Sequence, residues 1–190
     1  MDFKAVIQKR RTIRRFTQKE ISLEILKELI DFARLAPAGM NVQSLEYIII
    51  TDAKMREQLF PFLNWASALP RNQRTPEENR RPTVYIIVLN NTNIKKFADF
   101  DVGASVENIL LGATYYGLGS CWMGAIERNK IRELLHIPEQ YEIKQVISLG
   151  YPDEESIVEP YIDSFKYWKD ESGTMHVPKK SVDQSIYKIY

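Results

Sequence analysis

Basic residues near the N-terminus are the first candidates for chemistry in this sequence. They lie in residues 9–16, which read KRRTIRRF. Arg10 and Arg14 are four residues apart with Thr12 between them, so two guanidinium groups and a hydroxyl group can converge on one phosphate. The stretch therefore favours a phosphorylated ligand, although taken alone it fits a solvated basic turn equally well.

A glycine-rich run, residues 117–124 (GLGSCWMG), is a second candidate for phosphate binding. A dinucleotide-binding fingerprint needs a strand before its glycines and a helix that begins at them. Here a helical pattern precedes the run and residues 120–123 favour an extended chain, so the order is reversed. The run by itself predicts a helix end at Gly117 and close backbone approaches at Gly119 and Gly124.

The sequence gives little support for nucleophilic catalysis, acid–base catalysis or metal binding. Cys121 has no histidine near it in the sequence and lies among apolar residues, which predicts a buried, unreactive thiol. His136 and His176 lack a second ligand at the spacing of a metal site. The acidic residues of the segment 99–107 lie on a helical pattern, where helix capping and solvent exposure are their ordinary roles. We therefore predict no catalytic side chain and no metal ligand.

The composition indicates one globular domain over residues 1–190. Hydrophobic residues make up 44% of the chain and charged residues 27%, which are ordinary values for a globular protein. Lysine and arginine total 26 against 25 acidic residues, and this balance argues against nucleic acid or an anionic membrane as the main partner.

The cysteine content and the N-terminus predict a cytoplasmic location. One cysteine allows no internal disulfide, which suits a reducing compartment. Residues 1–16 are charged throughout and lack the apolar core of a signal peptide, and no later run has the length of a membrane span.

The elements that must position these residues are both helices and strands. Ser22 is a good N-cap for a helix that must end near Ala36, because the next residue is a proline. The segment 99–117 predicts a long helix that is apolar around most of its circumference, which is typical of a core or a subunit interface. Further helices are expected near residues 2–10, 53–62 and 128–136, and buried strands at 45–51, 83–89 and 143–149. Since strands and helices do not alternate regularly, the fold class is α+β.

Two segments fall outside this pattern. Residues 64–82 are polar, contain three prolines and carry Arg71, Arg74, Arg80 and Arg81, so we expect a lid-like excursion. From about residue 153 the chain is a polar C-terminal extension.

Four stretches, taken in order, resemble signature segments of the nitroreductase family of flavoproteins. Residues 10–16 resemble its R-R-S-I-R-x-F segment, and residues 36–43 (APAGMNVQ) resemble its A-P-S-x-x-N-x-Q loop. Residues 117–124 resemble its G-L-G-S segment with the following strand, and residues 149–152 match its L-G-Y-P. The resemblance covers residues 3–152, and a weaker resemblance is found at residues 178–180.

The resemblance implies a nitroreductase-like α+β fold with a central, mostly antiparallel sheet flanked by helices. It implies a homodimer in which both subunits build each FMN site. NADH or NADPH would supply hydride, and a small acceptor such as a nitroaromatic, a quinone or a flavin would then be reduced in a ping-pong mechanism. A same-fold enzyme with flavin-consuming or dehalogenating chemistry, and a non-enzymatic protein that binds a phosphorylated ligand, remain alternatives.

The resemblance also implies which residues bind the cofactor. The phosphate and ribityl chain would be held by Arg10, Thr12 and Arg14, with Arg11 contributing by position and with Lys179 or Lys180 completing the phosphate site. The partner's loop would line the ring through Pro37, Ala38, Gly39 and Asn41, and Gln43 of the same loop is also expected to bind the cofactor. The pyrimidine side would face Trp122, Met123 and Gly124. The family often has Pro-Trp where this chain has Ser44-Leu45, and it usually has serine where this chain has Ala38. The acceptor preference of better-known members therefore does not transfer to this chain.

Overall fold

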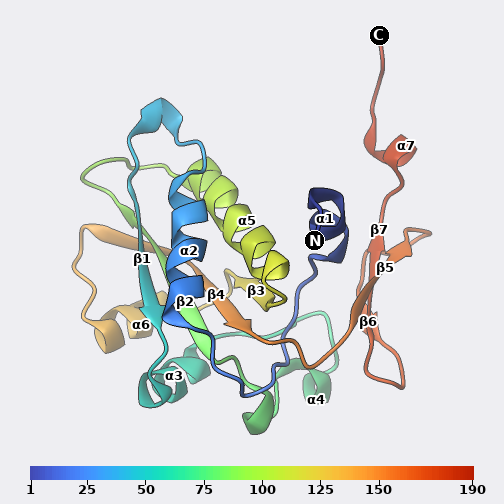
Figure 1. The fold of residues 1–190 in the computed structure, drawn as a ribbon, viewed down its shortest axis with the longest axis horizontal. Helices are drawn as coiled ribbons and strands as arrows, with labels where there is room; N and C mark the ends of the chain where they lie inside the picture. The colour runs from blue at the N-terminus through green and yellow to red at the C-terminus, as the bar shows by residue number, and fades with distance from the viewer.

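A four-stranded antiparallel sheet forms the centre of the protein, as a computed structural model of residues 1–190 shows (Figure 1). The strand order is β1-β2-β4-β3, and each neighbouring pair is antiparallel. The strands are β1 (Leu45–Ile50), β2 (Val84–Asn91), β3 (Gly119–Met123) and β4 (Tyr141–Gly150). The predicted α+β class and mostly antiparallel sheet are confirmed.

Strand β2 is buried on both faces because its side chains alternate between two apolar clusters. Val84, Ile86 and Val88 contribute to the first cluster, whereas Tyr85 and Ile87 contribute to the second. Strand β1 lies at the edge of the sheet, and only its last residue, Ile50, is fully buried. The prediction of a buried strand therefore holds for β2 and is wrong for most of β1, since an apolar run does not reveal an edge position.

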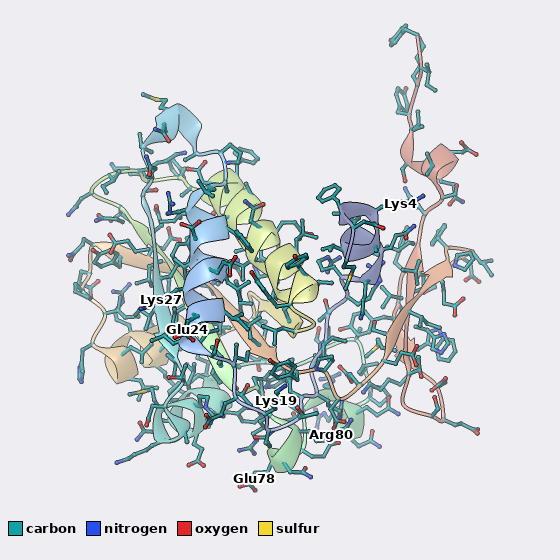
Figure 2. The ribbon with its side chains drawn as sticks, viewed as in Figure 1. Lys4, Lys19, Glu24, Lys27, Glu78 and Arg80 are labelled. Atoms are coloured by element: carbon teal, nitrogen blue, oxygen red, sulfur yellow. The ribbon has the colours of Figure 1, made fainter.

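Helices α2 (Leu23–Arg34) and α5 (Asp99–Tyr115) cover the face of the first cluster. The Oγ of Ser22 accepts the N–H of Ile25 and caps α2, as predicted. Leu26 faces the core, whereas Glu24 and Lys27 lie on the outer side of α2 (Figure 2). A Cβ added at Gly112 of α5 would lie 2.5 Å from the ring of Phe32, so glycine permits the close approach of these two helices.

The opposite face is covered by α3 (Ala53–Leu59), the 3-10 turn η2 (Phe60–Phe62) and α6 (Arg128–Leu135). The remaining short helices before the C-terminal region are α1 (Phe3–Lys9), η1 (Gly39–Asn41), α4 (Arg71–Arg74) and η3 (Glu78–Arg80). None of the helices combines the length and the hydrophobicity that crossing a bilayer requires.

Residues 64–82 are fixed to the body at several points. Trp65 and Leu69 are buried, and the backbone oxygen of Leu69 accepts a hydrogen bond from Arg74. Arg80 pairs with Asp153. These contacts describe one arrangement of the segment, and its closure as a lid stays a prediction.

The C-terminal extension forms a second, three-stranded sheet in the order β5-β7-β6. Its strands are β5 (Ser156–Pro160), β6 (Trp168–Lys169) and β7 (Met175–Lys179), and the short helix α7 (Val182–Ser185) follows. The chain end points away from the body (Figure 1), and Tyr187, Ile189 and Tyr190 are exposed. The sequence did not predict these strands, because β6 is only two residues long and the segment is mostly polar.

Candidate functional site

The basic stretch is extended rather than a turn, which corrects the turn expected from the sequence. Thr12 forms a bridge with Ser120 of β3, and the N–H of Ile13 donates to the backbone oxygen of Ser120 at 2.8 Å. On the other side, Asp153 donates to the backbone oxygen of Arg15 at 2.9 Å. The stretch is therefore held between β3 and the chain that leaves β4.

Alternation along this extended chain separates its side chains into two sets. Ile13 and Arg15 are buried, whereas Arg10, Thr12 and Arg14 are partly exposed. We call these three residues the basic row. Because an extended chain rises about 3.3 Å per residue, the row spans about 13 Å. Such a backbone spacing suits an elongated ligand with a phosphate at one end.

The two outer arginines of the row have different surroundings. The Nε of Arg10 lies 3.3 Å from Oε1 of Glu107, whereas the guanidinium of Arg14 lies 5.2 Å from the ring centroid of Tyr167 and forms no ion pair. Arg11 points elsewhere and donates to the backbone oxygens of Gln8 and Arg10. Burial, with repulsion from Arg10, lowers the pKa of Arg11. The guanidinium of Arg11 is thus engaged by the backbone.

Beneath the row lies a charge cluster that the sequence did not indicate. The Nε of Arg15 donates to Oε2 of Glu77 at 2.8 Å, and Nη1 of Arg15 lies 3.5 Å from Oε2 of Glu154. Burial opposes the charge of Arg15, but the contacts with Glu77 and Glu154 raise its pKa overall. The same hydrogen bond from Arg15 lowers the pKa of Glu77 to about 2. Lys169 completes the cluster through Glu154.

The loop of residues 37–43 is exposed and has an unusual backbone. Met40, Asn41 and Gln43 have φ angles of 57°, 53° and 50°, in the left-handed region that is uncommon for residues other than glycine. Such strain is often found where a loop binds a ligand. Gly39 donates its N–H to Oδ1 of Asp101 at 3.1 Å, so the first turn of α5 anchors the loop.

Asp101 is a buried anchor that the sequence did not single out. Burial raises the pKa of its carboxyl group, but the hydrogen bonds from Lys95 Nζ and Gly39 N–H outweigh this effect and lower the pKa. The distance from Lys95 Nζ to Asp101 Oδ2 is 2.6 Å. Nothing in the sequence distinguishes this acid from Asp99, which is exposed on the same helical turn.

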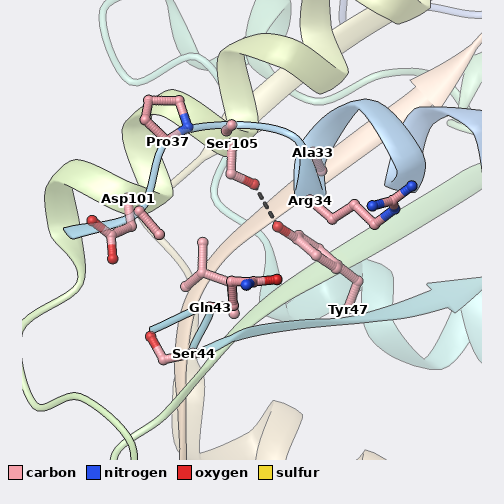
Figure 3. A pocket seen from close by; sticks show the side chains of 11 residues that line it. Ala33, Arg34, Pro37, Gln43, Ser44, Tyr47, Asp101 and Ser105 are labelled. Atoms are coloured by element: carbon pink, nitrogen blue, oxygen red, sulfur yellow. Dashed lines mark hydrogen bonds between the residues drawn. The ribbon is translucent and has the colours of Figure 1, made fainter. Parts of the chain in front are cut away.

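A small cavity lies behind the loop (Figure 3). Its volume is 120 Å³, and Tyr47 and Ser105 form a 2.5 Å hydrogen bond within its lining. Because a water molecule occupies about 30 Å³ of the liquid, the cavity has room for a few waters and not for a tricyclic ring. The loop of one chain alone therefore does not enclose a flavin ring.

Strand β3 presents the third set of predicted residues. Trp122 is 41% exposed and Gly124 is exposed, whereas Met123 is buried. A Cβ added at Gly124 would lie 2.9 Å from Oε1 of Gln145, so the backbone makes a close approach here. The neighbouring Cys121 is buried, which confirms the predicted burial of its thiol, and burial raises the pKa of this thiol to about 11.

The predicted residues fall into separate groups within one chain. The loop lies at the N-terminal end of α5, whereas the basic row passes beneath α1 toward β3, near the C-terminal end of α5 (Figure 1). Lys179 and Lys180 lie at the end of β7, and no hydrogen bond or ion pair joins either side chain to the row. The chain brings the row and β3 together but keeps the loop apart from both.

Fold and site together define an α+β protein with a basic row on an extended segment and a strained loop at the N-terminal end of α5. A family model described as "Nitroreductase family" matches residues 7–151. The chain belongs to the nitroreductase family.

Relatives and solved structures agree with this assignment. A protein of Archaeoglobus fulgidus named NADH dehydrogenase/NAD(P)H nitroreductase is 32% identical over 79% of this chain and 85% of its own length. A 4-nitrobenzoate reductase of Pseudomonas putida is 26% identical over 83% of this chain and 88% of its own. A solved FMN-dependent nitroreductase of Clostridium difficile superposes with a TM-score of 0.68 at 26% identity, covering 85% of this chain and 92% of that one.

Proposed function

We propose that the protein is an FMN-dependent oxidoreductase that takes hydride from NADH or NADPH and reduces a small acceptor. The observation that carries the proposal is the basic row, where an extended backbone holds Arg10, Thr12 and Arg14 on one side. The names of the relatives, which include NAD(P)H nitroreductase and FMN-dependent nitroreductase, support the same chemistry.

The residues present fit a flavin nucleotide. The row offers two guanidinium groups and a hydroxyl group over about 13 Å, which suits a phosphate followed by a ribityl chain. Gly124 is exposed at the end of β3, where a flat ring edge can approach. The exposed indole of Trp122 lies beside it.

The chain's own residues bind and orient, and they supply no acid or base. When bound, FMN would accept the hydride of NADH or NADPH and supply the electron chemistry, which calls for stabilisation of negative charge on its pyrimidine side. Backbone N–H groups at residues 122–124 and the side chain of Asn41 of the partner subunit would donate to that charge. The nicotinamide donor and the small-molecule acceptor would bind one after the other at the same exposed face of the flavin ring. This alternation gives ping-pong kinetics. Nitroaromatics, quinones and free flavins are the acceptor classes expected.

We propose a homodimer as the active form. Within one chain the ring-lining loop is separated from the row, so a second copy must supply one of them. An apolar groove of 470 Å³ between α1, α2 and α5 is lined by Phe3, Phe32, Leu35 and Tyr115 among others. Its exposed apolar surface favours coverage by another subunit. We also place the enzyme in the cytoplasm, since its one cysteine is a free, buried thiol.

The test is the identity of the bound cofactor and the turnover that it supports. Denatured wild-type protein should release FMN, and the native protein should oxidise NADH or NADPH in the presence of a nitroaromatic, a quinone or a free flavin. The acceptor with the highest kcat/KM identifies the preferred class. A colourless protein that takes up no added FMN would contradict the proposal and favour a binding protein for another phosphorylated ligand.

A further inference from the structure

One hydrogen bond ties the ring-lining loop, residues 37–43, to the rest of the chain. The backbone N–H of Gly39 donates to Oδ1 of Asp101 in α5 at 3.1 Å. The other hydrogen bonds that these residues make, such as that from the Asn41 N–H to the backbone oxygen of Ala38, stay within the loop. The position of the loop on the body of the protein therefore depends on Asp101.

Asp101 is itself held from a second side. Its side chain is 7% exposed, and its Oδ2 lies 2.6 Å from Nζ of Lys95. The backbone oxygen of Lys95 accepts a hydrogen bond from Asn90, a buried residue of β2, at 2.8 Å. A Cβ added at Gly39 would lie 2.7 Å from Nζ of Lys95, so glycine lets the ammonium group lie against the loop. We call Lys95 and Asp101 the loop clamp, because together they join the loop to β2 and α5.

The backbone of the loop requires such a clamp. Met40, Asn41 and Gln43 all have positive φ angles, which residues other than glycine adopt infrequently. Strained conformations of this kind persist only where the surrounding structure holds them in place. Without the clamp the loop can relax toward ordinary backbone angles, and the side chain of Asn41 then leaves its position.

The surroundings of the clamp indicate that a second copy of the chain covers this end of α5. Three large apolar side chains lie next to the clamp in the sequence and are almost fully exposed: Met40 at 95%, Phe97 at 84% and Phe100 at 96%. Exposed apolar groups that gather in this way favour burial against another subunit. Since one chain keeps the loop apart from its own basic row, the subunit that covers the loop is the one whose flavin the loop lines.

We infer that Lys95 and Asp101 are positioning residues that hold the ring-lining loop of one subunit in place for the flavin of the other subunit. This inference rests on the proposed function, because it takes the ligand to be FMN and the active form to be a homodimer. The clamp acts through Gly39 and does not touch the flavin. A defect in the clamp therefore impairs the site that contains the partner's basic row and leaves the row of its own chain intact.

Two double variants remove the clamp with and without the acceptor for Gly39. K95M/D101L and K95M/D101N both keep the net charge, but only asparagine retains an oxygen that can accept the Gly39 N–H. Leucine has the branched shape of aspartate, and apolar replacement of a buried ion pair is usually tolerated by the fold. The control E127L/K130M removes an exposed ion pair of α6, on the opposite face of the sheet.

The first readout is the dissociation constant of FMN, measured by quenching of flavin fluorescence. We expect K95M/D101L to weaken binding about tenfold, the scale of one hydrogen bond to a charged acceptor. K95M/D101N should stay within about threefold of the wild type and the control within about twofold, because neither loses the acceptor for Gly39.

A mixed dimer separates positioning in the partner from a structural role. The clamp variant K95M/D101L is co-expressed with R10A/R14A, which lacks the arginines of the row, and the mixed dimer is purified through two different affinity tags. One of its two sites combines the intact row of the clamp variant with the intact loop of the row variant. We expect this dimer to bind one FMN with a dissociation constant within about twofold of the wild type. A structural defect would follow the clamp variant into the mixed dimer and leave no site complete.

The inference is overturned if the mixed dimer binds FMN no more tightly than the two variant homodimers, or if K95M/D101L keeps the wild-type affinity. It is also overturned if K95M/D101N loses as much affinity as the variant without an acceptor. Where the leucine variant does not fold, K95M/D101A replaces it, since alanine also lacks the acceptor and leaves room for water. A wild-type protein that binds no FMN would overturn the proposed function itself, and this is seen before any substitution is made.

Discussion

The sheet and its helices pack through two clusters of 15 buried apolar residues each, whereas the C-terminal extension shares a cluster of only three. Polar contacts hold the extension instead. Lys169 pairs with Glu154, and His176 lies between Glu159 and Asp170 while its ring stacks on Trp168. The body formed by the central sheet and its helices is therefore stabilised by apolar burial, whereas the C-terminal extension is held by a few specific polar contacts. The same kind of substitution should change the free energy of unfolding by different amounts in the two regions.

The largest expected effect is on the core. Ile147→Ala should lower the free energy of unfolding by about 2–5 kcal/mol, because Ile147 is fully buried and its truncation leaves a cavity. Urea denaturation measures the change. The matched substitution Ile162→Ala removes an 84% exposed side chain of the extension and should change stability by less than about 0.5 kcal/mol. Similar losses in both variants would contradict the contrast between the two regions.

The basic row lies where the central sheet meets the C-terminal extension. Removal of one of its arginine side chains should weaken FMN binding more than it lowers the stability of the fold. Arg14→Ala should weaken FMN binding by about 1.5–3 kcal/mol, as expected when a charge-assisted bond to a phosphate is removed. A fluorescence titration measures the affinity, with Lys27→Ala on the exposed side of α2 as the control. Unchanged affinity in the Arg14 variant would place the phosphate elsewhere.

The 64–82 segment tests whether arginines outside the core take part in function, and of its four arginines Arg71 is exposed while the other three are partly buried. Neutralising Arg71, Arg74, Arg80 and Arg81 together should raise the KM for the nicotinamide donor about two- to fivefold, the scale of exposed charge contacts. The rise should be steeper at low salt, because screening acts over about 10 Å at 0.1 M. FMN binding should be unaffected. Donor kinetics equal to the wild type at low salt would show that the segment does not attract the donor.

The smallest expected effect concerns pH and the extension alone. The hydrogen bond to Glu159 raises the pKa of His176 despite the opposing effect of desolvation, and Asp170 adds to the rise. A raised pKa in the folded state gives stabilisation that is complete below the unfolded value of about 6.5 and is lost as pH rises through the folded value. The fluorescence of Trp168, stacked 3.9 Å from His176, should follow this loss. The variant His176→Gln should show no such transition, and a transition that persists there would assign it to another group.

The same contrast explains how much of the structure was predictable from the sequence. A short apolar, β-branched run predicted β2, and the helical spacing of apolar residues predicted α2 and α5, because both signals are written in neighbouring residues. The pairing of Glu154 with Arg14 was not predictable, because the two positions are 140 residues apart and each is an ordinary charged residue on its own.

The candidate site was predictable to a different degree in each part. Motif resemblance indicated the row, the loop and the end of β3, and the residues of β3 and the row do lie side by side. The extended shape of the row was missed, because a run of arginines carries no apolar period to distinguish a strand from a turn. Asp101, the anchor of the loop, was missed because its burial depends on the packing of Lys95 and Gly39 around it.

The central claim is that two chains together build a flavin site that one chain does not complete. Sedimentation velocity at low protein concentration, recorded at both the flavin and the protein absorption bands, tests it directly. We predict that the flavin absorbance sediments with a dimer that carries about one FMN per chain. Dilution to monomer should release the flavin, because a ligand held by both subunits stabilises the dimer by mass action. A flavin-loaded monomer would contradict the claim.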